Sequence, residues 1–251
     1  MIVADSKKLL YVHIYKTGGS SITDLLAPYI TEEFRSKKVK TSGPRWQDSW
    51  HFDRIQHSKF SEALPKLDRY NINLDEYFKF VFVRNPYSWV LSIWNNFYQS
   101  PHRNSTINFK NFLKLNARKL LNKKLDSQYF YEMYSDNSFK SFILFIDEII
   151  SKDMPIAKTA WGAADQYSFV ENDRNIKFDF VGRFENLLED SNKIFNTLGI
   201  QKLDEMPHRI CSKNKQKRQN YLEYYDEESI KIVNKLFIRD FENFGYQLIK
   251  P

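Results

Sequence analysis

A glycine-containing loop between an apolar run and an amphipathic run is the feature that most constrains this fold. Residues 9–14 are apolar and β-prone, which is typical of a buried strand. Residues 15–21 hold two adjacent glycines among hydroxyl side chains. Apolar side chains then recur at helical spacing, at Ile22, Leu25, Leu26, Tyr29 and Ile30. The pattern predicts a strand, a loop and a helix in that order.

The same order recurs twice later in the chain. Residues 78–83 form the strongest predicted strand, and Pro86 follows where a helix begins, a place where its missing N–H costs nothing. A third strand is predicted at residues 178–182, ahead of a helix at residues 186–198. Further helices are predicted at residues 61–67, at 139–150 and around 230–241.

Strands that alternate with helices predict an α/β fold, a parallel sheet flanked by helices. The 251 residues suit one domain, and no linker is long enough to divide them. We therefore expect a single domain over residues 1–251. Residues 100–165 are rich in Asn, Lys and Phe, and we expect them to form a helical insertion.

Charge and cysteine content narrow the classes of partner. The net charge of +7 favours anionic partners, although a lysine excess also serves solubility. The single cysteine, Cys211, allows no intrachain disulfide and indicates a reducing compartment. No apolar run is long enough for a signal peptide or a membrane span. We expect a cytoplasmic protein without a membrane span.

The first loop has the chemistry of an anion site. Backbone N–H groups at a helix start attract phosphate, glycines let it approach closely, and Lys16 adds a positive charge. The order differs from the Walker A pattern, in which the lysine follows the glycines. A plain tight turn is the alternative. The candidate ligands are Lys16, Thr17, Gly18, Gly19, Ser20 and Ser21.

The second predicted strand leads directly into another basic loop. Arg84 follows that strand and Ser92 lies eight residues further on. Arginine offers a planar fork for phosphate, while a structural ion pair is the alternative role for Arg84. Ligands bind at the carboxyl ends of parallel strands. We therefore expect the Lys16 loop and Arg84 to share one edge of the sheet.

The two loops together resemble the sulfotransferases that use 3'-phosphoadenosine 5'-phosphosulfate (PAPS), particularly the carbohydrate group with its heparan and chondroitin/dermatan enzymes. "HIYKTGGSSI" resembles the 5'-phosphosulfate loop, and "FVFVRNPYSWVLSIW" resembles the 3'-phosphate element. "DQYSFV", with Gln166, "DFVGRFENLLED" and "FIRDFENFGY" resemble three later stretches. The resemblance runs from about Leu10 to Tyr246 and implies a sulfotransferase fold similar to that of P-loop NTPases.

The resemblance also assigns roles. Residues 16–21 would bind the 5'-phosphosulfate, and Arg84 with Ser92 would bind the 3'-phosphate. Trp89 stands where the family often has a second arginine, and Ala164-Asp165 replaces the expected proline before Gln166. A loop that closes over the cofactor would correspond to Lys213, Lys215, Lys217 and Arg218, although a solvated charge run is equally consistent with them.

Sulfuryl transfer needs a base for the acceptor proton, positive charge at the leaving group, and alignment. Lys16 is the candidate to supply positive charge at the leaving oxygen, and no metal is needed in principle. The resemblance points to a histidine between the two loops as the base. We expect it to be His57, with His51 next and with Asp53 or Glu62 behind them.

Two other classes of function compete with this prediction. One is a Mg²⁺-dependent nucleotide kinase or NTPase, although no apolar strand ends in a suitable Asp. The other is a non-catalytic module for anionic polymers, although no RNA-recognition signature is present. We expect a carbohydrate or another hydroxyl acceptor and no nucleic acid. The sequence leaves the identity of the acceptor and the oligomeric state open.

Overall fold

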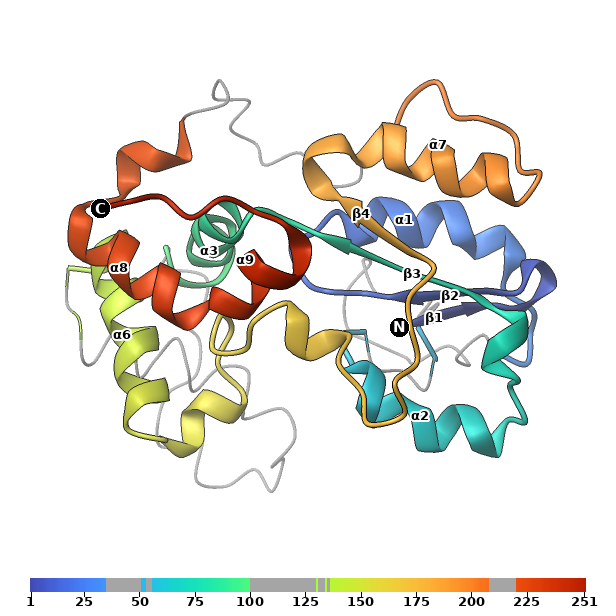
Figure 1. Ribbon diagram of the computed structural model, residues 1–251, viewed down its shortest axis with the longest axis horizontal. Helices are drawn as coiled ribbons and strands as arrows, with labels where there is room; N and C mark the ends of the chain where they lie inside the picture. The colour runs from blue at the N-terminus through green and yellow to red at the C-terminus, as the bar shows by residue number, and fades with distance from the viewer. Residues whose placement is uncertain (35–50, 53–55, 100–129, 131–133, 135, 208–219) are drawn as a thin grey trace, which may run out of the picture. The chain divides into compact units, whose positions relative to one another are not determined.

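The computed structural model describes residues 1–34, 51–52, 56–99, 130, 134, 136–207 and 220–251 (Figure 1). The chain divides into two compact units. The first contains Met1–Asn85 and Gln166–Gln216, and the second contains Pro86–Asp165 and Lys217–Pro251. The predicted single domain and its insertion over residues 100–165 stay predictions, and residues 100–129 lie outside the described part.

The first unit contains a four-stranded sheet in the order β1-β2-β3-β4. Its strands are β1 (Ile2–Ala4), β2 (Leu9–Val12), β3 (Phe78–Val83) and β4 (Phe180–Arg183). β2, β3 and β4 run parallel, whereas β1 pairs antiparallel with β2. The predicted α/β class and the three parallel strands are confirmed. β1 was not predicted, because three apolar residues are too few to show a period.

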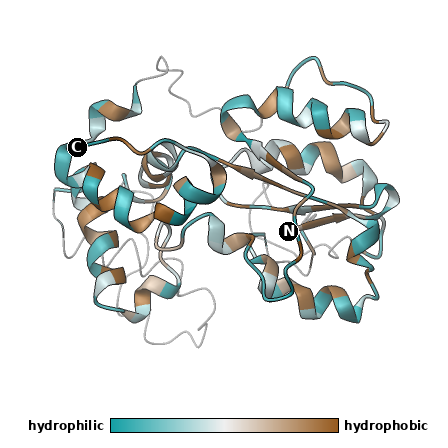
Figure 2. Cartoon of the chain, in the orientation of Figure 1, coloured by the Kyte–Doolittle hydropathy of each residue, from teal (hydrophilic) through white to brown (hydrophobic). Residues whose placement is uncertain are grey.

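Helices cover both faces of this sheet. Figure 1 shows α1 (Gly19–Leu26) and α7 (Leu187–Thr197) on one side and α2 (Phe60–Arg69) on the other. The strands are therefore shielded on both sides, and Figure 2 shows them mostly in brown. Continuous apolar strands are typical of such a sheet. The first predicted helix ends at Leu26, and a 3₁₀ turn that contains Pro28 follows it.

A glycine fixes the packing between β3 and β4. Gly182 lies opposite Phe82 in the strand register. A Cβ atom at Gly182 would lie 2.4 Å from the Phe82 ring. The ring therefore occupies the space that any other side chain at position 182 would need, one residue before β3 ends at Val83.

The second unit is helical in its described residues. It contains α3 (Pro86–Ile93), a π turn (Trp94–Tyr98), α6 (Phe139–Ser151), α8 (Glu227–Leu236) and α9 (Ile238–Phe244). The predicted C-terminal helix is therefore two helices. The α6 helix packs against α8, where Lys140 pairs with Asp226 at 2.7 Å and Lys235 with Asp147 at 2.9 Å. No helix among the described residues is long and apolar enough to cross a membrane.

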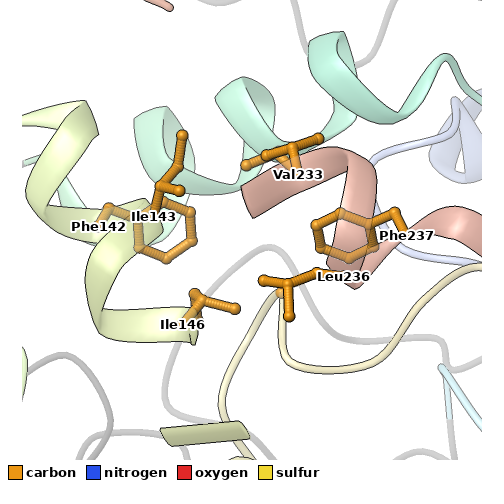
Figure 3. A pocket seen from close by; sticks show the side chains of 8 residues that line it. Phe142, Ile143, Ile146, Val233, Leu236 and Phe237 are labelled. Carbon is orange, nitrogen blue, oxygen red and sulfur yellow. The ribbon is translucent and has the colours of Figure 1, made fainter. Parts of the chain in front are cut away.

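A small apolar cavity lies inside the second unit. Its volume of about 10 Å³ is enough for about one water molecule, and an apolar lining leaves such a space dry. Figure 3 shows apolar side chains of α6 and α8 pointing toward one another around it. This cavity is a packing gap with no room for a ligand. Its lining is Val90, Phe142, Ile143, Ile146, Gly162, Val233, Leu236 and Phe237.

Candidate active site

The Lys16 loop connects β2 to α1 in the first unit, as predicted. Lys16 has a φ of 65° and Gly18 a φ of 87°, so the chain turns twice through the left-handed region. That conformation suits glycine and costs other residues energy. α1 begins at the next residue, Gly19, without a side-chain cap at Gly18. The start of a helix leaves N–H groups without partners within the helix, and Lys16 stands three residues before Gly19.

A buried histidine ring makes Gly19 indispensable. A Cβ atom at position 19 would lie 1.8 Å from Nε2 of His13. The imidazole is 3% exposed and stacks on Tyr11 with a centroid distance of 5.6 Å. Its Nδ1 atom lies 2.9 Å from Nε2 of His51. The ring is therefore held on two sides, and α1 can start here only with a glycine.

The three hydroxyl side chains of the loop differ in what they contact. Thr17 is buried and donates to the Ile14 carbonyl at 2.9 Å. Ser21 donates to the Pro207 carbonyl at 2.6 Å. A hydroxyl has one hydrogen to donate, so these two fix the loop in this structure. Among the described residues, Ser20 makes no comparable bond, so its hydroxyl is the one that can turn to an anion.

Arg84 lies against the Lys16 loop, which agrees with the prediction that the two share one edge of the sheet. Its Nη1 atom donates to the Lys16 carbonyl at 3.3 Å. The guanidinium lies over the Phe184 ring, 4.3 Å from its centroid, a cation–π arrangement. The Gly18 Cβ position would in turn lie 3.3 Å from the same ring. One aromatic ring thus touches both predicted anion-binding elements of the first unit.

Side chains from distant residues hold the main chain at Arg84. The Gln166 amide accepts from the Arg84 N–H at 2.8 Å and donates to the Arg84 carbonyl at 2.8 Å. Glu185 accepts from the Asn85 N–H at 2.8 Å. Gln166 was predictable only through its resemblance to a family segment, and the contacts of Phe184 and Glu185 were not predicted. The signal available was the "GRFENL" stretch that contains both.

Three histidines form a cluster beside the first loop. His57 lies with Nδ1 3.0 Å from the His13 carbonyl, and its ring is 5.8 Å from that of Tyr15 between centroids. Burial lowers the pKa of His51 to about 2. Burial, and secondarily the neighbouring His57 and His51, lower the pKa of His13 well below its ordinary value. His13 and His51 are therefore neutral at ordinary pH.

Comparison with known proteins agrees with this architecture. A sequence profile described as "Sulfotransferase family" matches residues 1–247. The chain belongs to the sulfotransferase family. A protein named carbohydrate sulfotransferase 12, from Xenopus laevis, is 22% identical over 260 residues. The match covers 98% of this chain but 60% of that relative's length. No solved structure gives a significant match.

The remaining residues that were predicted for the site of this sulfotransferase family member have no recorded contact with the Lys16 loop or Arg84 among the described residues. Glu62 caps α2, where its carboxylate accepts from the Lys59 N–H at 3.4 Å. Ser92 lies in α3 of the second unit. Asp53, Cys211 and the basic residues 213–218 lie outside the described residues. Within the described part of the chain, no group of three or more His, Cys, Asp or Glu side chains is arranged for a metal ion.

Proposed function

We propose that this chain moves a sulfuryl group from PAPS to a hydroxyl of a carbohydrate. One observation carries the proposal. In a sulfotransferase family member, the Arg84 guanidinium lies 3.3 Å from the Lys16 carbonyl. The cation of Arg84 therefore meets the backbone of the Lys16 loop where parallel strands end, the usual ligand position in such sheets.

The chemistry of these residues fits a nucleotide that is charged at both ends. The Lys16 ammonium and the N–H groups at the start of α1 suit the 5'-phosphosulfate. The fork of Arg84 suits the 3'-phosphate, and Ser92 would add a hydroxyl there. Thr17, Gly18, Gly19, Ser20 and Ser21 would shape or line the phosphosulfate loop. No step of this scheme requires a metal.

The tautomer of His57 supports its role as the base. A carbonyl only accepts hydrogen bonds, so the contact with His13 requires a proton on Nδ1 of His57. In the neutral ring, Nε2 then carries the lone pair. His51 is a weaker candidate, because a pKa of about 2 makes its ring a poor proton acceptor at neutral pH.

The proposed reaction is an in-line displacement at sulfur. As the acceptor oxygen forms its bond to sulfur, Nε2 of His57 takes the hydroxyl proton. The bond from sulfur to the bridging phosphate oxygen breaks, and adenosine 3',5'-bisphosphate leaves with the electron pair. Lys16 stabilises the charge that develops on this leaving oxygen. The carbohydrate acceptor rests on the family resemblance and on the name of the Xenopus relative.

The test separates binding from turnover. His57→Ala should bind adenosine 3',5'-bisphosphate like the wild type in calorimetry, while sulfate transfer from labelled PAPS falls about 10²–10⁴-fold. Lys16→Ala should lose transfer and retain its far-UV spectrum, whereas Lys202→Ala, an exposed charge in the same unit, should change neither. Full activity of His57→Ala would remove the base assignment. Tight binding of ATP with Mg²⁺, without binding of the bisphosphate, would favour a kinase instead.

A further inference from the structure

We infer that Gln166 is a positioning residue that, together with Phe184, aims Arg84 at the 3'-phosphate of the nucleotide. This inference rests on the proposed function and adds the residues that make the site selective for a 3'-phosphorylated nucleotide. Both residues act through Arg84, and neither is assigned a contact with the nucleotide.

The Gln166 side chain continues the hydrogen-bond pattern of β3 by one residue. The last paired residues of β3 and β4 are Val83 and Arg183. At the next residue of β3, the Gln166 amide exchanges two hydrogen bonds of 2.8 Å with the N–H and the carbonyl of Arg84. A residue pair in an antiparallel ladder exchanges bonds in this way. Only one orientation of the amide satisfies both contacts, because the N–H must meet oxygen and the carbonyl must meet nitrogen.

The position of Gln166 makes this clamp rigid. Its side chain is 0% exposed, so water does not compete for the two bonds. An apolar replacement would leave two main-chain polar groups of Arg84 without these partners. The bonds fix the backbone from which the guanidinium extends. They therefore limit the positions that a long, flexible side chain can reach.

Phe184 fixes the other end of the arginine. The guanidinium lies 4.3 Å from the centroid of the ring, and Nη1 contacts the Lys16 carbonyl at 3.3 Å. The ring is itself wedged beside Gly18. Main chain and guanidinium are thus both held before a ligand arrives. Such preorganisation lowers the entropic cost of binding, and it does so only for a ligand that uses Arg84.

The inference predicts a selective loss of affinity. Gln166→Met removes both bonds and keeps the length of the side chain. In calorimetry its affinity for adenosine 3',5'-bisphosphate should fall about tenfold, the effect of losing one good interaction. Its affinity for AMP, which lacks the 3'-phosphate, should change less than about twofold. Gln201→Met, the same change at an exposed glutamine, should leave both affinities unchanged.

A double variant separates positioning from a general loss of structure. If Gln166 acts through Arg84, adding Gln166→Met to Arg84→Ala should lower bisphosphate affinity no further, because the shared interaction is already lost. Additive losses, or equal losses for bisphosphate and AMP, would overturn the inference. If the wild type itself binds the two nucleotides equally, the proposed function fails rather than the positioning role.

Phe184→Leu is the second variant, in case Gln166→Met does not fold. Leucine keeps apolar contact with Gly18 and removes the ring face under the guanidinium. The ratio of bisphosphate to AMP affinity should fall about two- to fivefold, in line with a partly exposed cation–π contact. An unchanged ratio in this variant would also refute the inference.

Discussion

The two basic loops of the first unit follow neighbouring parallel strands, yet they are shaped in different ways. The loop after β2 is shaped mainly by its near neighbours, with left-handed turns at Lys16 and Gly18 and with His13 against Gly19. The segment after β3 is held by side chains about 80 to 100 residues away in sequence, those of Gln166 and Glu185. The turns of the first loop are local, although Ser21 also bonds to Pro207, whereas tertiary contacts hold the segment after β3.

This difference separates two tasks. A phosphate cradle made of backbone N–H groups needs particular dihedral angles, which glycines and short-range contacts supply. A guanidinium on a long side chain is positioned only if both its main chain and its charged end are held. Only packing from other elements supplies such contacts. Changes at the glycines of the first loop should therefore affect folding of the β2–α1 junction, whereas loss of the Gln166 contacts with Arg84 should affect nucleotide selectivity.

The largest expected effect tests the first loop. Gly19→Ala places a Cβ atom 1.8 Å from Nε2 of a His13 ring that His51 and Tyr11 hold in place. Overpacking of this severity should cost about 3 kcal/mol of unfolding free energy. Denaturant unfolding measures this cost, and nucleotide binding should fall as well because α1 must move.

Two further variants identify the cause of that loss. Gly199 has a φ of 62° with no atom within 4 Å of its Cβ position, so Gly199→Ala carries backbone strain alone and should cost about 1 kcal/mol. His13→Ala empties the space beside position 19. The pair His13→Ala with Gly19→Ala should thus be more stable than the two separate losses predict. Strict additivity would mean that the ring does not block the position.

The second expected effect is a pH dependence of the unfolding free energy, which comes from two buried histidines beside the first loop. His13 and His51 have pKa values far below their ordinary value in the folded chain, so the unfolded chain binds more protons once the pH falls below about 6.5. Stability should be fully present above that pH. Below it, stability should decrease with a slope that approaches about 1.4 kcal/mol per pH unit for each histidine.

Urea unfolding between pH 7.5 and about 5 tests this slope in a range where carboxylates contribute little. The His51→Gln variant keeps a polar side chain beside His13 and cannot take up that proton. Its stability should decline less steeply below pH 6.5 than that of the wild type. Equal slopes in the two proteins would show that His51 is not a buried neutral group.

The contrast between the two loops also explains which parts of the fold and of the candidate site could be predicted from the sequence. Apolar runs gave the places of β2 and β3, and the glycines gave the loop between β2 and α1, because those patterns are local. The clamp on Arg84 was not predictable in this way. Gln166 is an isolated glutamine with no periodic pattern, and its amide meets Arg84 only after the chain has folded. The sequence favoured His57 over His51 as the candidate base only through a resemblance, and the burial that lowers the pKa of His51 is a property of the tertiary structure.

The smallest expected effect tests the second segment. Glu185 is exposed and accepts the N–H of Asn85 at 2.8 Å, so Glu185→Ala removes one hydrogen bond next to Arg84 without opening the core. The unfolding free energy should fall by about 1 kcal/mol.

Glu189→Ala is the matched control, since Glu189 is also exposed, on α7, and forms a surface ion pair with Lys193. Such pairs contribute little, so its stability should stay unchanged. A loss for Glu189→Ala as large as that for Glu185→Ala would mean that negative charge in this region, and not the bond to Asn85, stabilises the segment after β3.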